Sequence, residues 1–430
     1  MRPALLPFDE ALAALLARAD ALPGTENVPT IDAAGRVLAG DQRSSLNVPP
    51  MDNTQMDGFA VCCADLAGAA AARLRVSQRI PAGQVPARLE PGTAARIFTG
   101  AMIPEGADAV VMQEQTEADG EFVVVRHRPQ PGEWIRRAGE DITAGSVILP
   151  AGTRLTPQAT GLAASVGLAS LPVHRRVRAA CYFTGDELVM PGDPLPPGAI
   201  YNSNRFVLTA LLRALGCEVT DLGIVPDSLA ATRAALREAA AGNDLIVTSG
   251  GMSVGEEDHV KPALEAEGEL DMWQIAIKPG KPLAYGRVRR GAPGVAPHAA
   301  AAHAASAGHD ASAAPPSFAH FIGLPGNPVS SFVTFLLLVR PFVLRLQGAT
   351  DVAPQAFAMR ADFDWPRPDK RREFLRVRVN AAGGLDLFPN QSSGVLTSTV
   401  WGGGLVDNAP SQVIGRGDVV RFLPFAALAS

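Results

Sequence analysis

Short apolar runs alternate with helix-like segments from residue 177 to residue 258, and this alternation constrains the fold more than any other feature of the chain. The apolar runs read VRAACYF, CEVTDLGIV and DLIVTSGG. Between them, residues 203–215 and the segment after Ser228 are expected to form helices. Because strand–helix alternation is typical of a parallel sheet covered on both faces, we predict a central α/β domain.

The third apolar run leads into a glycine turn, DLIVTSGGMSVGEED. Gly250 and Gly251 end the run abruptly, and without Cβ atoms they allow a ligand to approach the backbone N–H groups. Gly255 is a further glycine of the same kind in this turn, and residues 258–268 are predicted to form a short helix. A strand, a glycine turn and a helix start indicate an anion site at the carboxyl end of the sheet. A plain turn is the alternative.

Three carboxylates follow strands of the same predicted sheet: Glu187, Asp227 and Asp258. Carboxylates gathered at one edge repel each other unless a hard cation neutralises them, and Mg²⁺ with oxygen ligands suits this arrangement best. The alternative is that each carboxylate caps a separate helix. The motif GLPGNP leads from the same edge into a long helix expected from Val329.

Two lysines, Lys278 and Lys281, lie three residues apart in the proline-rich segment KPGKP. Because proline keeps such a segment extended, the two ammonium groups would favour a polyanion. A solvated surface turn is the alternative.

Residues 44–150 consist of short apolar runs separated by proline and glycine turns, which indicates a β-rich module. Asp57 precedes a glycine at the start of one run, where a simple turn is equally expected. Thr99 follows an apolar pair and is suited to contact a phosphate. Glu140 and Asp141 follow a glycine and are compatible with plain surface charge.

Other features of the chain exclude several classes of protein. The net charge of -5 argues against a general nucleic-acid binder, and the four cysteines have no metal-ligand spacing. These cysteines are expected to be reduced, buried thiols of a cytoplasmic protein. The apolar run 332–346 is interrupted by Arg340-Pro341 and is predicted to be a buried helix, too short to span a bilayer. No signal peptide is expected. Residues 291–317, almost wholly Ala, Gly, Pro, Ser and His, are predicted to form a disordered insertion in a hairpin, and their histidines are not expected to bind metal.

Eight ordered motifs then make the chain similar to a known family. They read MDGFAV, TGAMIPEGADAVVMQE, GED, TGDEL, YNSN, TSGGMSVGEEDHVK, KPGKP and GLPGNPVSS. The chain resembles the molybdopterin molybdenumtransferase family, which is related to the E domain of gephyrin. The resemblance implies a homodimer of elongated subunits with four domains each: an elongated N-terminal domain of residues 1–43 plus 147–176, a β-rich domain 44–146, a MogA-like α/β domain 177–348, and a β-barrel-like domain 349–430. It also implies an active cleft between the α/β domain of one subunit and the β-rich domain of the other.

The resemblance further implies a Mg²⁺-dependent reaction that inserts molybdenum from molybdate into adenylylated molybdopterin and releases AMP. Glu187, Asp227 and Asp258 would be catalytic and hold Mg²⁺, directly or through water, and the opposite wall would present Asp57, Thr99 and Asp141. The pterin-phosphate loop would comprise Gly250, Gly251, Ser253 and Gly255. The molybdate site would comprise Lys278, Lys281, Ser330, Arg371 and Ser393, with Ser392 as the alternative to Ser393.

Two alternatives compete with this reading of the motifs. An adenylyltransferase for the preceding step needs only the α/β domain, and the flanking β-rich modules count against it. A non-catalytic molybdopterin-binding scaffold would not be expected to retain the acidic residues. Expected partners are a second copy of the chain, a MogA-type adenylyltransferase, and molybdenum apoenzymes or their chaperones, with neither nucleic acid nor membrane.

Overall fold

The structure, a computed structural model, describes residues 5–67, 70–251, 259–290 and 317–429. The chain divides into two compact units. The first unit comprises Met1–Gly40, Ala151–Pro157 and Ser170–Ser430, and the second comprises Asp41–Pro150 and Gln158–Ala169. The division into four domains at the boundaries given above stays a prediction.

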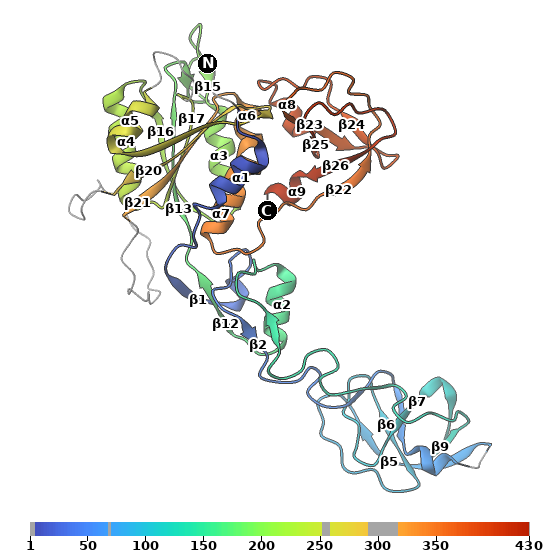
Figure 1. Ribbon diagram of the computed structural model, residues 1–430. Coiled ribbons are helices and arrows are strands. Elements are labelled where there is room, and N and C mark those ends of the chain that lie inside the picture. The colour runs from blue at the N-terminus through green and yellow to red at the C-terminus, as the bar shows by residue number, and fades with distance from the viewer. Residues whose placement is uncertain (1–4, 68–69, 252–258, 291–316, 430) are drawn as a thin grey trace. The chain divides into compact units, whose positions relative to one another are not determined.

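A six-stranded mixed sheet forms the centre of the first unit (Figure 1). Its first four strands run parallel, and the last two are antiparallel to their neighbours. The strand order is β16 (Glu218–Val225), β13 (Arg178–Thr184), β17 (Leu245–Ser249), β21 (Phe318–Leu324), β20 (Pro282–Arg289) and β18 (Gly268–Gln274). The predicted parallel sheet and the predicted hairpin between β20 and β21 are therefore both confirmed.

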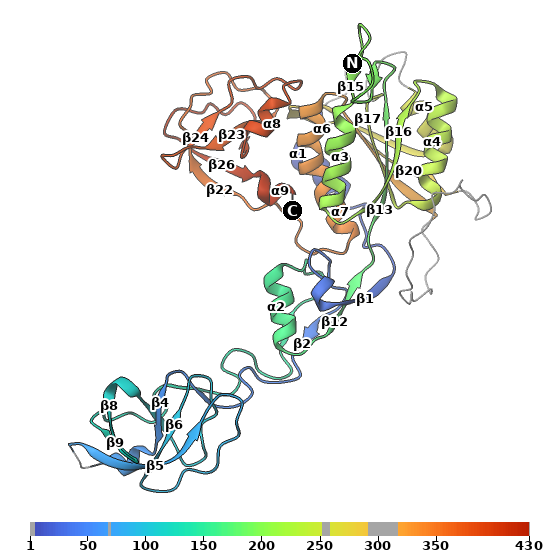
Figure 2. The ribbon, with the colours of Figure 1, turned by 180° about the vertical axis from the view of Figure 1, so that it is seen from behind.

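Helices cover both faces of this sheet (Figures 1 and 2). Alternate residues of one strand point to opposite faces, so Ala180 and Tyr182 of β13 pack in one core while Ala179 and Cys181 pack in the other. The first of these cores is closed by α4 and α5, and the second by α1, α3 and the long helix α6–α7. The helix bounds are α1 (Phe8–Leu16), α3 (Ser203–Ala214), α4 (Leu229–Gly242) and α5 (Val260–Glu267).

The order of the strands creates a crevice at one edge of the sheet. After β13 the chain adds β16 on one side, and it then crosses to add β17 on the other side of β13. Ligands of open α/β sheets bind outside the carboxyl ends of the strands at such a reversal. The turns that follow Thr184 and Ser249 flank this crevice.

The long helix runs from Pro328 to Leu346 through α6 (Pro328–Thr334), a π-helical segment (Phe335–Val339) and α7 (Arg340–Leu346). The expectation that Arg340-Pro341 makes it too short to cross a bilayer is wrong. A π segment precedes the proline and the helix continues through it, so that the whole helix is 19 residues long. It is the one helix in the described part of the chain that is long and apolar enough for a span. However, 89% of its apolar window is buried, as predicted, and a core helix meets the same criteria.

A second sheet at the end of the first unit has the order β19 (Ile277–Lys278), β23 (Arg372–Val379), β25 (Gly404–Asn408), β26 (Val419–Pro424) and β22 (Phe357–Arg360). A further strand, β24 (Leu385–Leu387), pairs with β23. An isolated bridge between Ala361 and Leu385 curls the sheet toward the predicted barrel shape. Strand β19 was not predicted, although it joins the lysine segment to this sheet.

The second unit contains a six-stranded sheet, which confirms the β-rich prediction. Its order is β7 (Ala109–Met112), β4 (Gly58–Val61), β6 (Thr93–Ile97), β5 (Ala72–Ile80), β9 (Phe122–Val125) and β8 (Thr116–Asp119). The remaining named elements are β1 (Thr25–Pro29), β2 (Gln42–Arg43), β3 (Asn53–Thr54), β10 (Ile135–Arg136), β11 (Val147–Leu149), α2 (Pro157–Ser165), β12 (Ser170–His174), β14 (Leu188–Val189), β15 (Ile200–Tyr201), α8 (Thr397–Trp401) and α9 (Phe425–Ala429).

Two further sequence predictions have a structural outcome. The four cysteines are free, but only Cys181 and Cys217 are buried, since Cys62 and Cys63 are half-exposed. Of the insertion 291–317 that is predicted to be disordered, residues 291–316 lie outside the described residues. At its base, the Arg290 amide donates to the Ser317 carbonyl oxygen at 3.0 Å.

Candidate active site

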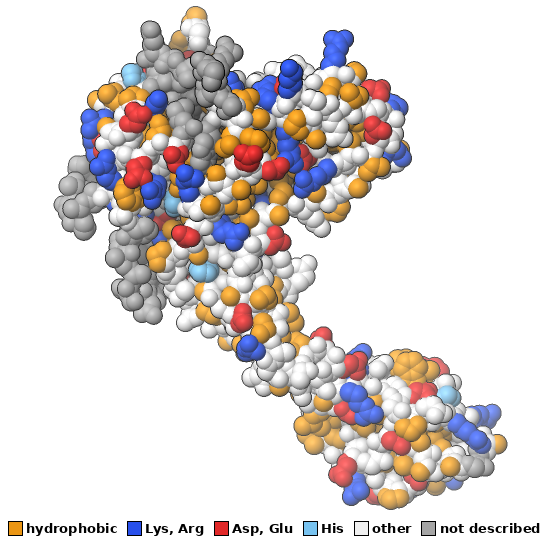
Figure 3. Space-filling view, viewed as in Figure 1, with side chains coloured by type: hydrophobic (Ala, Val, Ile, Leu, Met, Phe, Trp, Pro, Cys, Tyr) orange, Lys and Arg blue, Asp and Glu red, His pale blue; other side chains and the backbone are white. Residues whose placement is uncertain are grey.

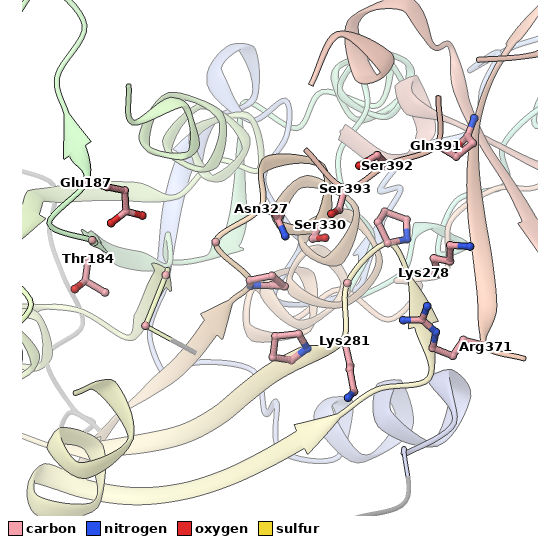
Figure 4. A pocket seen from close by; sticks show the side chains of 18 of the residues that line it. Thr184, Glu187, Lys278, Lys281, Asn327, Ser330, Arg371, Gln391, Ser392 and Ser393 are labelled. Carbon is pink, nitrogen blue, oxygen red and sulfur yellow. The ribbon is translucent and has the colours of Figure 1, made fainter. Parts of the chain in front are cut away.

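A pocket of about 750 Å³ lies in the first unit at the carboxyl ends of the parallel strands. Its walls come from the turns after β13, β16, β17 and β21, the lysine segment, Arg371, and the loop 391–393. Figure 4 shows Glu187 and Thr184 on one side and Lys278 and Arg371 on the other, with serine hydroxyls between them. The pocket therefore has an acidic end and a cationic end.

The acidic end is built around Asp227 in the turn after β16. Its carboxylate accepts hydrogen bonds from the Thr184 hydroxyl and, at 3.2 Å, from the Asp186 amide. The Asp227 amide in turn donates to the Asp186 carboxylate at 3.2 Å. These bonds fix the two turns against each other. Glu187 lines the same pocket and is exposed.

The turn after β17 accepts only glycine at its first position. Gly250 has φ +104°, and a Cβ atom there would lie 2.3 Å from the Thr184 carbonyl oxygen. Gly251 also has a positive φ, +62°. Both glycines line the pocket, where their backbone is open to the approach of a ligand. The other predicted members of this loop, Ser253, Gly255 and Asp258, lie outside the described residues.

A group of hydrogen-bonded side chains lies behind the glycine turn. The sequence alone assigned no role to its members, although one of them, Asn204, belongs to the motif YNSN. The Asn204 amide donates to the Ser249 hydroxyl and to the Gly326 carbonyl, both at 2.7 Å. The hydroxyls of Ser249 and Ser331 both donate to the Pro325 carbonyl oxygen. The turns after β17 and β21 are thereby held together by side chains from α3 and α6.

The cationic end depends on the parallel pairing of β19 with β23, which places Ile277 opposite Arg372 and Lys278 opposite Glu373. The Lys278 ammonium lies 3.1 Å from the Glu373 carboxylate and 3.6 Å from that of Asp369. Glu373 is completely buried and also accepts from the Trp365 indole at 2.7 Å. The charge of Lys278 is therefore largely balanced by the protein itself.

Arg371 is balanced in the same way. Its guanidinium binds both oxygens of Asp369, at 3.0 and 2.9 Å, and these hydrogen bonds lower the pKa of the Asp369 carboxyl although partial burial opposes the shift. Lys281 differs, since it is exposed and forms no ion pair with any residue that the structure describes. It is the lysine whose charge is most available to a ligand.

Serine hydroxyls lie between the two ends of the pocket. Ser330 lies in the first turn of α6, and the Val329 amide before it donates to the Ser393 carbonyl oxygen at 3.0 Å. This bond brings loop 391–393 beside α6, so Ser330 and Ser393 lie close together (Figure 4). Ser392 lines the pocket as well, so both serines remain candidates for the predicted site.

The three remaining predicted residues lie in the second unit. Asp57 accepts from the Thr99 amide at 2.8 Å and from the Thr99 hydroxyl at 2.6 Å. These two bonds lower the pKa of the Asp57 carboxyl, which therefore stays ionised at neutral pH. Asp141 is exposed, and its amide donates to the Val48 carbonyl oxygen at 2.9 Å.

The described residues contain no group of three or more His, Cys, Asp or Glu side chains arranged for a metal ion. Two of the predicted Mg²⁺ ligands, Glu187 and Asp227, line the pocket, and the third, Asp258, lies outside the described part of the chain. Asp227 uses one hydrogen bond on each of its oxygens, so lone pairs remain for a cation. These carboxylates fit a hard, oxygen-liganded ion such as Mg²⁺.

Positive and negative side chains are interspersed on the face of the first unit seen in Figure 3. The fields of neighbouring opposite charges cancel at a distance, so a mixed surface of this kind does not concentrate a polyanion. Selective anion binding then depends on local groups, such as those at the cationic end of the pocket.

Models of known families match three successive parts of the chain. The MoeA N-terminal region (domain I and II) matches residues 6–167, and the MoeA C-terminal region (domain IV) matches residues 358–425. Between them, a probable molybdopterin binding domain matches residues 180–345, which include the glycine turn and the lysine segment. The fold and the pocket thus define a multidomain protein of molybdenum cofactor biosynthesis.

Curated relatives identify the family. The molybdopterin molybdenumtransferase of Haemophilus influenzae is 40% identical over 388 residues, which cover 89% of each chain. Molybdopterin molybdenumtransferase 2 of Mycobacterium tuberculosis strain H37Rv is 38% identical over 369 residues, 83% of this chain and 84% of that one. The chain belongs to the molybdopterin molybdenumtransferase family and is a transferase.

Solved structures agree with this assignment along the whole chain. A crystal structure of the molybdopterin biosynthesis MoeA protein from Pyrococcus horikoshii OT3 superposes with a TM-score of 0.79 at 26% identity, covering 98% of this chain and 100% of that one. A second structure from the same species gives a TM-score of 0.73 at 30% identity and covers 98% and 99% of the two chains.

Proposed function

We propose that the protein inserts molybdenum from molybdate into adenylylated molybdopterin, in a Mg²⁺-dependent step that releases AMP. The two thiols of the dithiolene replace two oxo groups of molybdate, which leave as two water molecules; the thiols supply two of the four protons, and hydrolysis of the phosphoanhydride supplies the other two. Hydrolysis of the phosphoanhydride consumes one water and releases AMP. The net products are the molybdenum cofactor, AMP and one water.

The separation of charge within one pocket is the observation that supports this proposal. Molybdate is a tetrahedral dianion, and at the cationic end Lys281 offers an unbalanced charge while Ser330 and Ser393 offer hydroxyl donors. Carboxylates line the opposite end, where a phosphoanhydride needs a cation between its oxygens. A pocket of about 750 Å³ has room for a pterin together with molybdate.

The protein's own groups have distinct roles in this proposal. The turn at Gly250 and Gly251 lets its backbone approach the pterin phosphate, and Lys281 orients molybdate. Asp227 fixes the turn at Thr184 and, with Glu187, faces the phosphoanhydride. Bound Mg²⁺ would neutralise the charge that develops on the anhydride oxygens.

We further propose that the working protein is a homodimer in which Asp57, Thr99 and Asp141 of one subunit complete the site of the other. The hydrogen bonds between Thr99 and Asp57 hold an ionised carboxylate at the surface of the second unit, where it is accessible to a ligand. A MogA-type adenylyltransferase would supply the adenylylated substrate, and molybdenum apoenzymes or their chaperones would accept the product.

The decisive experiment measures AMP release from adenylylated molybdopterin by the purified protein, with and without Mg²⁺ and molybdate, and then reconstitution of a molybdenum-free apoenzyme. We expect AMP release that requires both ions and restores apoenzyme activity. Tight substrate binding without AMP release would instead indicate a pterin-binding scaffold. Formation of adenylylated molybdopterin from ATP would indicate the adenylyltransferase of the preceding step.

A further inference from the structure

Arg376 carries a charge that no carboxylate in the described part of the chain balances. It lies on β23, its exposed fraction is 1%, and it takes part in none of the ion pairs of the described residues. Its guanidinium donates only to neutral oxygens: the Ser398 hydroxyl at 3.2 Å and the carbonyls of Phe374 and Ser392, both at 3.3 Å.

A buried charge without a counter-ion is costly, because the protein interior solvates it poorly. Burial lowers the pKa of Arg376 to about 10, which still leaves the guanidinium protonated at neutral pH. Hydrogen bonds to neutral oxygens recover only part of the lost hydration. A charged side chain in this position is therefore explained if an anion binds nearby.

Arg376 lies directly behind the wall of the pocket. The carbonyl that it binds belongs to Ser392, which lines the cationic end. Gln391, also in the lining, accepts from the Arg376 amide at 2.9 Å and donates to the Arg376 carbonyl at 3.0 Å. Both the side chain and the backbone of Arg376 therefore fix the loop that carries Ser393.

Of the other cations of this wall, Lys281 is unpaired among the described residues but exposed to solvent, whereas the other two are neutralised by carboxylates. Lys278 and Arg371 are paired with the buried carboxylate of Glu373 and the half-buried carboxylate of Asp369. Because the charge of Arg376 is buried, it acts through a medium of low dielectric and is screened little by salt. Its field extends across the Ser392 peptide into the pocket.

We propose that Arg376 is a positioning residue for a tetrahedral oxyanion bound beside Ser330 and Ser393, supplying unscreened positive charge and holding the Ser392 carbonyl. This inference rests on the proposed function, and it adds a member to the site that does not touch the ligand. The oxyanion is either molybdate or the phosphate group of the pterin substrate, and the two sources are separable by titration.

The test compares Arg376→Lys, which keeps the charge, with Arg376→Gln and Arg376→Met, which remove it. A matched control is Arg340→Met, because Arg340 is a buried arginine of α7 that does not line the pocket. For each protein we would measure the molybdate concentration that gives half-maximal AMP release, at low and high ionic strength. Melting temperature would be recorded during separate titrations with molybdate and with inorganic phosphate.

For the neutral variants we expect the half-saturating molybdate concentration to rise at least about tenfold, as for loss of a charge-assisted interaction. The maximal rate should change much less, Arg376→Lys should recover most of the affinity, and the difference should persist at high salt. A shift of the molybdate titration would identify molybdate as the supported anion, and a shift of the phosphate titration would identify the pterin phosphate.

Three results would overturn the inference. The first is wild-type affinity for both anions in Arg376→Gln, and the second is an equal loss in Arg376→Lys and Arg376→Gln. The third is failure of both neutral variants to fold while Arg340→Met folds, which would assign Arg376 to the stability of the sheet alone. If the wild-type protein itself released no AMP with molybdate, the proposed function would fail first, independently of these comparisons.

Discussion

Lys278 and Lys281 lie three residues apart yet differ in how their charges are used. Lys278 lies 3.1 Å from buried Glu373 and 3.6 Å from Asp369, so its charge serves largely to balance these two carboxylates. Lys281 is exposed and unpaired with respect to the residues that the structure describes. Lys281 should therefore contribute more to molybdate binding than Lys278 does, although both residues are lysines.

Replacing Lys281 with alanine should raise the half-saturating molybdate concentration about tenfold, because a charge-assisted contact is lost. Excess molybdate should restore most of the rate. Asp227→Asn, in contrast, should slow AMP release even at saturating molybdate, since it acts at the other end of the pocket. Lys261→Ala is a matched control, because Lys261 is an exposed lysine of α5 outside the pocket. Steady-state assays with varied molybdate would measure both effects, and a loss in Lys281→Ala that excess molybdate does not restore would contradict the assignment.

His320 on β21 makes the stability of the first unit depend on pH. Burial, followed in effect by the charge of Arg287, lowers the pKa of His320 to about 4, and its ring nitrogen Nδ1 lies 2.9 Å from the Tyr285 hydroxyl. The unfolded chain binds the proton below pH about 6.5, whereas the folded chain binds it only near pH 4. Stability is therefore lost as the pH falls from about 6.5 toward 4.

At pH 5 this loss should reach about 2 kcal/mol of unfolding free energy. Urea unfolding at pH 7.5 and pH 5.0 would measure it. His320→Asn, which removes the titrating group, should show a correspondingly smaller difference between the two pH values. Equal pH dependence in the variant and the wild type would refute this role of His320.

At the scale of elements, the turn after β17 is the most restrictive part of the fold. Gly250→Ala should destabilise the first unit by about 2 kcal/mol or more, because a Cβ atom would meet the Thr184 carbonyl and the φ angle is positive. Gly326→Ala is the matched control for stability, since its Cβ atom would lie 3.8 Å from its nearest neighbour, the Gly250 Cα. Thermal unfolding would compare the two variants, and similar melting temperatures would show that the turn relaxes to admit a side chain.

The insertion between β20 and β21 should be dispensable. Arg289 pairs with Phe318, and Arg290 hydrogen-bonds to Ser317, so the two strands are already in register at its base. Replacing residues 291–316 with Asn-Gly, which favours a two-residue hairpin turn, should leave the melting temperature and the rate of AMP release close to wild type. A large loss of either would assign a function to the insertion.

The central elements could be predicted because their signals are local. Apolar runs such as Leu245–Ser249 and the glycines after them carry the strand and the turn in a single stretch of sequence. Strand β19 could not be predicted, because its two residues are extended only through pairing with β23, almost 100 residues later in the chain. For the same reason the sequence did not indicate that Glu373 balances Lys278, or that Arg376 lies behind the pocket.

At the scale of the whole molecule, the proposed sharing of a site between subunits predicts complementation. Asp57→Asn and Lys281→Ala alter different units of the chain. If one site uses Asp57 from one subunit and Lys281 from the other, each mixed dimer contains one site free of both changes. Random exchange would then restore about a quarter of the wild-type sites.

The rate of AMP release by the mixed variants would measure this recovery. The assay would use conditions in which each variant alone releases AMP slowly. Differently tagged subunits would verify that exchange has occurred. Asp227→Asn mixed with Lys281→Ala would give the background, because both changes lie in the first unit and no mixed dimer then contains an unaltered site. Absence of recovery despite proven exchange would place the complete site within a single subunit.

The pairing of β19 with β23 also has a consequence for how the chain can be recombined. The lysine segment belongs to the α/β domain by sequence, yet its first residue, Lys278, is part of β19, an edge strand of the C-terminal sheet. A chimaera that takes residues 177–348 from one relative and the C-terminal sheet from another would inherit the acidic end of the pocket intact, but it would have to rebuild the cationic end at the new junction. Exchanges should therefore preserve residues 277–281 and 369–376 as one inherited block.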